Sequence, residues 1–118
     1  MKVFISQPMS GKTDEEIINR REEIKKYCIK VFKKPMDFID SFTKPNELVE
    51  HGRVAMLGHS VSLMYDADLV VFDEKWDKSP GCRVERFVCE EYGIPVFDID
   101  NPVARVHKLI YDDILFWR

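Results

Sequence analysis

Hydrophobic and polar positions alternate along the chain in short blocks that predict strands and helices in turn. Residues 2–5 are apolar and rich in β-formers, and the loop-like residues 6–11 follow them. Thr13 and Glu16 then match a capping box, which predicts a helix over about residues 14–32. The apolar stripe of this helix consists of Ile17, Ile24, Cys28 and Val31.

The middle of the chain continues the same alternation. Residues 36–39 predict a brief second strand, and residues 40–52 lack a clear period, so we expect a loop over the ligand site there. Residues 69–72 form a continuous apolar run that is typical of a strand buried on both faces. Between them a helical stripe is predicted at Val54, Leu57, Val61 and Met64.

Cap signals divide the last third of the chain. Ser79 and Pro80 supply an N-cap and a first-position proline, and Gly93 supplies a stop. We therefore predict a helix over about residues 80–92 and a strand over residues 95–99. A terminal helix follows from the same signals at Asn101 and Pro102, with a stripe at Val103, Val106, Ile110 and Ile114.

Strict alternation of strands and helices has a consequence for the fold. It implies right-handed crossovers and a parallel sheet covered by helices on both faces. We predict one α/β domain over residues 1–118, a small doubly wound (flavodoxin-like or Rossmann-like) three-layer sandwich with a mainly parallel sheet of four to five strands. In such sheets, ligands bind outside the carboxyl ends of the strands. The loops at residues 6–11 and 73–81 are therefore the expected binding region.

Composition narrows the function classes. A formal net charge of −3 leaves no excess of Lys and Arg for coating a nucleic-acid backbone, so no duplex nucleic acid is expected as a partner. The most basic stretch, residues 20–34, is interpreted as a solvated helix face. Three cysteines without a C-x-x-C pair favour a reducing compartment, and no apolar run has membrane-spanning length. We expect a cytoplasmic protein without a membrane partner.

One charged residue stands on an otherwise apolar stripe of the helix predicted over residues 80–92. The members of that stripe are Cys82, Glu85, Cys89 and Tyr92. A carboxylate that faces a sheet must be paired, hydrogen-bonded or shifted toward its neutral form, and such carboxyls are candidates for catalysis. The alternative, that Glu85 simply pairs with Arg83, Arg86 or the helix N-terminus, stays open.

The start of the same helix also offers ligand chemistry. Ser79 and Gly81 are residues expected at ordinary helix starts, yet such a start exposes N–H groups that bind phosphate. Trp76 either closes its loop against the core or stacks on a base. His59 and Ser60 have no partner at ligand spacing, so no metal site is expected.

Three segments together resemble one known superfamily. Residues 3–11 resemble the first strand and sugar-binding loop of the nucleoside 2-deoxyribosyltransferases and their relatives, the nucleoside 5′-monophosphate N-glycosidases. Residues 66–72 resemble the third strand of that superfamily with its lead-in. Residues 76–85 resemble its signature, in which a glycine, here Gly81, precedes the catalytic glutamate by four residues; Glu85 occupies the glutamate position.

The resemblance implies a hydrolase or transferase that acts at the N-glycosidic bond of a (deoxy)nucleoside 5′-monophosphate. Glu85 would attack the anomeric carbon, which is sound chemistry because a nearby anion stabilises and traps an oxocarbenium-like transition state. Ser79 and Gly81 would bind the phosphate, and Trp76 would lie near the base. The first loop would hold sugar or phosphate through Ser6, Gln7, Pro8, Met9, Ser10 and Gly11.

The resemblance also implies a ligand class, a cofactor requirement and an oligomeric state. Its partner would be a small-molecule nucleotide or nucleoside, no metal or organic cofactor would be required, and the chain would form a homodimer or a larger homo-oligomer. The aromatic pair Phe116 and Trp117 would then pack either on a second copy or on the chain's own core.

Two positions depart from the family pattern. Phe4 stands where a tyrosine orients the nucleophile, and Ser60 stands where an aspartate assists the base. Each replacement removes a group that the mechanism uses, so other acids such as Asp73 or Asp77 become candidates. Two rival functions stay open: a protein that binds or sequesters a nucleotide signal without cleaving it, and a flavodoxin-like interaction module without a small-molecule site.

Overall fold

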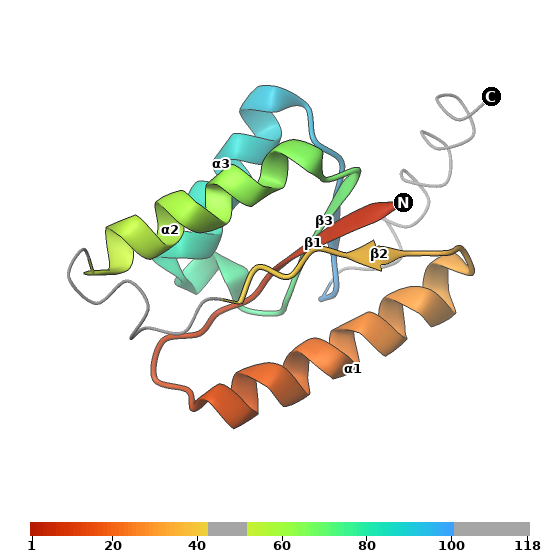
Figure 1. Cartoon of the computed structure of the whole chain (residues 1–118), viewed down its shortest axis with the longest axis horizontal. Coiled ribbons are helices and arrows are strands. Elements are labelled where there is room, and N and C mark those ends of the chain that lie inside the picture. The colour runs from red at the N-terminus through yellow and green to blue at the C-terminus, as the bar shows by residue number, and fades with distance from the viewer. Residues whose placement is uncertain (43–51, 101–118) are drawn as a thin grey trace.

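The computed structural model describes residues 1–42 and 52–100, and Figure 1 shows the arrangement of their elements. In chain order the elements are β1 (Lys2–Ser6), α1 (Asp14–Phe32), β2 (Asp37–Phe38), α2 (Gly52–Leu63), β3 (Leu69–Phe72), α3 (Pro80–Tyr92) and β4 (Val96–Asp98). Two short 3-10 helices, η2 (Met64–Asp66) and η3 (Trp76–Lys78), flank β3.

The four strands form one all-parallel sheet in the order β2-β1-β3-β4. The chain first steps from β1 to β2 and later crosses to the other side of β1 to lay down β3. The strand order therefore reverses between β1 and β3, whose last residues, Ser6 and Phe72, are partners in the register. This arrangement confirms the predicted α/β class with its parallel, doubly wound sheet.

Two apolar clusters hold the three layers together. Figure 1 shows α1 on one face of the sheet and α2 with α3 on the other. Because side chains alternate along a strand, Val3 and Ile5 of β1 pack on the α1 side, and Phe4 packs on the opposite side with Met64 and Cys89. All four residues of β3 are buried, as expected for a strand covered on both faces.

The helix boundaries follow from the cap residues. The Thr13 side chain accepts from the Glu16 amide, and the Glu16 side chain accepts from the Thr13 amide, which completes the predicted capping box of α1. Gly93 ends α3 in the left-handed conformation, with φ of 69°. The predicted ranges of α1 and α3 are confirmed.

The edge strands are shorter than predicted. Strand β2 spans two residues instead of four, and β4 spans three instead of five. Hydrogen bonds still reach beyond β4, because the Pro95 carbonyl accepts from the Val70 amide and the Ile99 amide donates to the Phe72 carbonyl.

Several predicted burial patterns are wrong. Val54 is 81% exposed and Tyr92 is 80% exposed, although both were assigned to apolar stripes. Within the basic stretch, Arg21 is buried in the core face of α1, so that stretch is not simply a solvated face. Tyr92 is the last residue of α3, and Arg21 has a polar partner in Ser41; periodicity reports neither the end of a helix nor such a partner. The predicted terminal helix, with Phe116 and Trp117, and most of the predicted loop over residues 40–52 lie outside the described residues.

Candidate active site

Polar side chains at the carboxyl ends of three neighbouring strands each meet a side chain from a helix. Ser6 ends β1, Asp73 follows β3 and Asp98 ends β4. All three are buried. Their helix partners are Glu85 of α3, Arg20 of α1 and Arg86 of α3, respectively. The predicted binding edge is therefore lined by polar contacts between layers.

Glu85 is held by two serine hydroxyls. Ser6 Oγ donates to Glu85 Oε1 at 2.7 Å, and Ser60 Oγ of α2 donates to Glu85 Oε2 at 2.8 Å. Ser6 points toward α3 because it follows Phe4 by two residues and so shares its face of the sheet. Glu85 as a whole residue is only 6% exposed. Three elements thus fix its position.

Burial raises the pKa of the Glu85 carboxyl above its ordinary value. The hydrogen bonds from Ser6 and Ser60 and the positive charge of Arg21 act in the opposite direction without cancelling the effect of burial. The alternative that Glu85 merely pairs with Arg83 or Arg86 is not what the structure shows. Arg83 donates to the Asp77 carbonyl, and Arg86 binds Glu90 and Asp98.

The start of α3 lies next to this carboxylate. Ser79 is the N-cap, and its hydroxyl accepts from the Cys82 amide at 3.4 Å. Burial raises the pKa of the Cys82 thiol, and the hydroxyls of Ser6 and Ser79 act in the opposite direction. A Cβ added to Gly81 would lie 3.9 Å from Leu57 Cδ1, an ordinary contact, so packing does not require glycine there.

The predicted sugar-binding loop divides into an inner and an outer part. Ser6 and Gln7 are buried, whereas Pro8 and Met9 are half-buried. Ser10 and Gly11 are exposed in a turn closed by the Lys12 amide and the Met9 carbonyl, and Gly11 has a φ of 78° that favours glycine. Within residues 1–42 and 52–100, no hydrogen bond joins this outer part to Glu85.

Trp76 packs on the protein itself. Its ring lies 5.4 Å from that of Phe72, and the guanidinium of Arg86 lies 4.7 Å from its centroid. Arg86 also stacks on Phe72 at 4.9 Å and binds the Asp98 carboxylate. The structure therefore shows Trp76 closing its loop against the core, and its predicted contact with a base stays a prediction.

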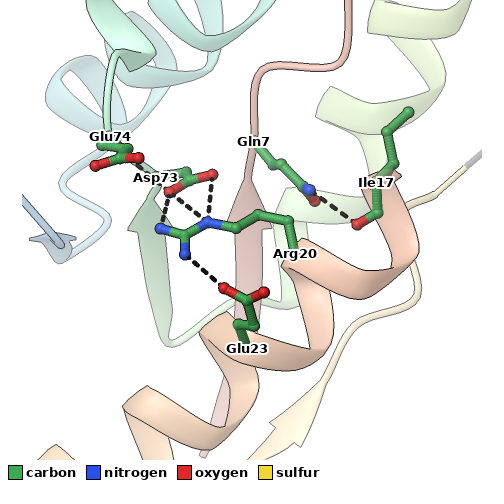
Figure 2. A network of polar contacts seen from close by, with 6 residues as sticks. All are labelled: Gln7, Ile17, Arg20, Glu23, Asp73 and Glu74. Atoms are coloured by element: carbon green, nitrogen blue, oxygen red, sulfur yellow. Dashed lines mark hydrogen bonds and ion pairs between the residues drawn. The ribbon is translucent and has the colours of Figure 1, made fainter. Parts of the chain in front are cut away.

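Asp73 is engaged by α1. Figure 2 shows Arg20 reaching Asp73, where Nη2 donates to Oδ1 at 2.7 Å, while its Nη1 donates to Glu23 at 3.0 Å. Asp73 also accepts from the Glu74 amide at 2.7 Å. These contacts raise the pKa of Arg20 and leave Asp73 as an anchor between α1 and β3. Asp77 is exposed, and within residues 1–42 and 52–100 no hydrogen bond joins either aspartate to Glu85, so their part in a reaction stays a prediction.

Sequence reasoning missed two residues of this region. Ser60 was interpreted as a lost aspartate, yet its hydroxyl binds Glu85 directly. Arg21 was placed on a solvated face, yet it is 5% exposed and donates to Ser41 Oγ at 3.2 Å. A signal for Arg21 was present, because it lies four residues after Ile17 and three before Ile24 on the apolar stripe.

Other reactive chemistry has less support. Burial raises the pKa of the Cys82 thiol, and it raises those of Cys28 and Cys89 to about 12, so all three stay protonated near neutral pH. Within residues 1–42 and 52–100, no group of three or more His, Cys, Asp or Glu side chains is arranged to hold a metal ion. In the same ranges, none of the helices combines the length and apolar character needed to cross a membrane.

The chain matches none of the protein-family models, curated proteins or solved structures with which it was compared.

Proposed function

We propose that the protein cleaves or transfers the N-glycosidic bond of a (deoxy)nucleoside 5′-monophosphate, with Glu85 as the nucleophile. The observation that carries this proposal is the position of Glu85. Its carboxylate is buried, and one serine donates to each oxygen. It lies at the carboxyl ends of β1 and β3, the two paired strands between which the strand order reverses. The resemblance of residues 3–11, 66–72 and 76–85 to the deoxyribosyltransferase superfamily supplies the reaction class.

The proposed reaction has two steps. Glu85 attacks the anomeric carbon, so that a C–O bond forms while the C–N bond breaks and the base leaves with the electron pair and takes up a proton. Water, or a second base, then attacks the same carbon, and the C–O bond to Glu85 breaks. The attacking molecule loses a proton to solvent, which balances the proton that the first base took from solvent. A carboxylate with a raised pKa is a stronger nucleophile when ionised, so the burial of Glu85 supports this role.

Ser6 and Ser60 supply hydrogen bonds to Glu85 where the family pattern has a tyrosine and an aspartate. Phe4 is fully buried in the core and offers no hydroxyl, so it does not orient the nucleophile. Ser6 and Ser60 each donate a hydrogen bond to Glu85 and are suited to that task. We propose that they replace the missing tyrosine and aspartate as orienting groups.

A nucleotide-binding protein without catalysis is the second candidate. It is favoured by the same serine contacts, because both oxygens of Glu85 already have a hydrogen-bond partner, and by the absence of a carboxylate at Ser60. In this case the site would capture a nucleotide and leave the glycosidic bond intact.

Incubation with each ribonucleoside and deoxynucleoside 5′-monophosphate, followed by chromatography for free base, tests the proposal. We expect release of base from at least one nucleotide, and loss of that release in Glu85→Gln. The matched control is Glu90→Gln, an exposed glutamate on the same helix, which should keep the activity. A thermal shift with a nucleotide but no base from any of them would favour the second candidate.

The expected partner, location, oligomeric state and cofactor requirement are also proposals. We propose a small-molecule nucleotide or nucleoside as partner, a cytoplasmic location, a homodimer or larger homo-oligomer, and a reaction without a metal or organic cofactor.

A further inference from the structure

Arg21 is a buried guanidinium with unused hydrogen-bond donors. It is 5% exposed, and its Nη1 donates to Ser41 Oγ at 3.2 Å. Its Nε and Nη2 are buried and have no partner within residues 1–42 and 52–100. No carboxylate of those residues lies within ion-pair distance of it, although Arg20 beside it binds two.

The side chain of Arg21 reaches the carboxyl edge of the sheet. Arg21 lies on the buried stripe of α1 between Ile17 and Ile24. Ser41, to which its guanidinium donates, follows β2. Glu85 lies at this edge as well, because Ser6 at the end of β1 donates to Glu85 Oε1. Burial lowers the pKa of Arg21, and the charges of Asp40 and Glu85 act in the opposite direction.

Gln7 presents a second unused group at the same edge. Its Nε2 donates to the Ile17 carbonyl at 2.9 Å, as Figure 2 shows, and its Oε1 is buried without a partner among the described residues. Ile17 lies one helical turn before Arg21, so the amide of Gln7 sits beside the turn from which Arg21 projects.

Buried polar groups are normally satisfied, and a buried charge without a partner is costly. Two free N–H donors on one guanidinium match the two oxygens of a phosphate or carboxylate in bidentate geometry. The free acceptor of Gln7 matches a hydroxyl donor. A sugar phosphate carries both groups, so one such molecule offers a partner of the right kind to each residue.

We propose that Arg21 and Gln7 form a subsite beside Glu85 in which Arg21 binds a phosphate group of the ligand and Gln7 accepts from a neighbouring hydroxyl. The assignment of that phosphate to a nucleotide rests on the proposed function, whereas binding of the anion does not. In this proposal Arg21 takes the phosphate that the resemblance assigns to Ser79 and Gly81. The start of α3 is a separate place, where Ser79 caps the helix by accepting from the Cys82 amide.

Inorganic phosphate is the probe that tests the subsite, with melting temperature and calorimetry measured at constant ionic strength on the full chain. We expect phosphate to stabilise the unmodified protein and Ser79→Ala, and to have no effect on Arg21→Met. The control Lys26→Met, which removes an exposed charge from the same helix, should respond like the unmodified protein. The melting temperature of each variant without phosphate is the reference from which its shift is measured.

Arg21→Lys keeps the charge and decides the question if Arg21→Met fails to fold. A lysine lacks the planar fork, so we expect the phosphate dissociation constant to rise about tenfold or more. The inference is overturned if phosphate has no effect on the unmodified protein, or if both Arg21 variants that fold respond normally. It is also overturned if Ser79→Ala alone loses the response, since the start of α3 would then be the anion site.

A second set of titrations separates this inference from the proposed function. In Glu85→Gln, we expect each deoxynucleoside 5′-monophosphate that binds to do so more tightly than its deoxynucleoside. Adding Arg21→Lys should reduce this difference in affinity by about tenfold or more. If phosphate stabilises the protein only when Arg21 is present, and no nucleotide releases its base, then the proposed function is contradicted and the subsite is supported. If a nucleotide releases its base, and the Arg21 variants respond to phosphate like the unmodified protein, then the subsite is contradicted and the proposed function is supported.

Discussion

Glu85 illustrates how a single side chain is tuned by groups from different layers. Burial raises the pKa of its carboxyl, while hydroxyls from β1 and α2 and the charge of Arg21 limit the rise. A residue kept only for stability has no reason to bear this cost, because a neutral side chain of similar shape would fill the same place. Two predictions follow from this balance, one for stability and one for activity.

We expect Glu85→Gln to raise the melting temperature at neutral pH. The folded pKa of Glu85 lies above its unfolded value, so the stability that the protonated form provides is lost as pH rises through the folded pKa. The rise in melting temperature of Glu85→Gln over the unmodified protein should therefore shrink as pH falls. It should vanish below about 4.3, the ordinary pKa of glutamate. Melting curves across this pH range measure it. A variant that melts lower than the unmodified protein at pH 7 would show that Glu85 is structural.

We expect Ser60→Ala to shift the acid limb of kcat/KM to higher pH. The hydroxyl donates to the ionised carboxylate, so its removal raises the pKa of Glu85 further and delays ionisation. The pH profile of base release measures the shift. Ser62→Ala is the matched control, because that hydroxyl donates to the His59 carbonyl on the same helix. Equal profiles for both variants would contradict the assigned role of Ser60.

Secondary-structure elements show where prediction from sequence succeeds. Capping residues mark α1 and α3, and the apolar run of β3 is unmistakable, so these three elements were predicted with their observed bounds. The short strands β2 and β4 gave weaker signals, because few residues of each pair with a neighbour. Cross-layer contacts, such as that of Arg20 with Asp73, leave no periodic trace in the sequence.

Asp73 tethers α1 to the end of β3, and we expect Asp73→Asn to lower the free energy of unfolding by about 1–3 kcal/mol. The estimate stays below the range for a fully buried ion pair because Arg20 remains 30% exposed. Urea unfolding measures the change. Glu23→Gln, which alters the exposed partner of the same arginine, should change stability by less than about 0.5 kcal/mol. Similar losses in both variants would mean that burial of Asp73 adds nothing.

The molecule as a whole brings distant segments to one edge of the sheet. The predicted topology placed the loops after β1 and β3 together, which was enough to connect Ser6 with the region of Glu85. It was not enough to identify Ser60 or Arg21, since their partners lie in elements whose side-chain contacts depend on packing rather than on local pattern. A polar residue on an apolar stripe is the sequence signal that marks Arg21 as well as Glu85.

Detection of a glycosyl-enzyme intermediate tests the central claim most directly. The unmodified protein would be mixed with the nucleotide that releases base, quenched rapidly in acid, digested and analysed by mass spectrometry. The account predicts a sugar phosphate attached through an ester to the peptide that contains Glu85, and no such adduct in Glu85→Gln. Base release that persists in Glu85→Gln, or an adduct on another residue, would contradict it.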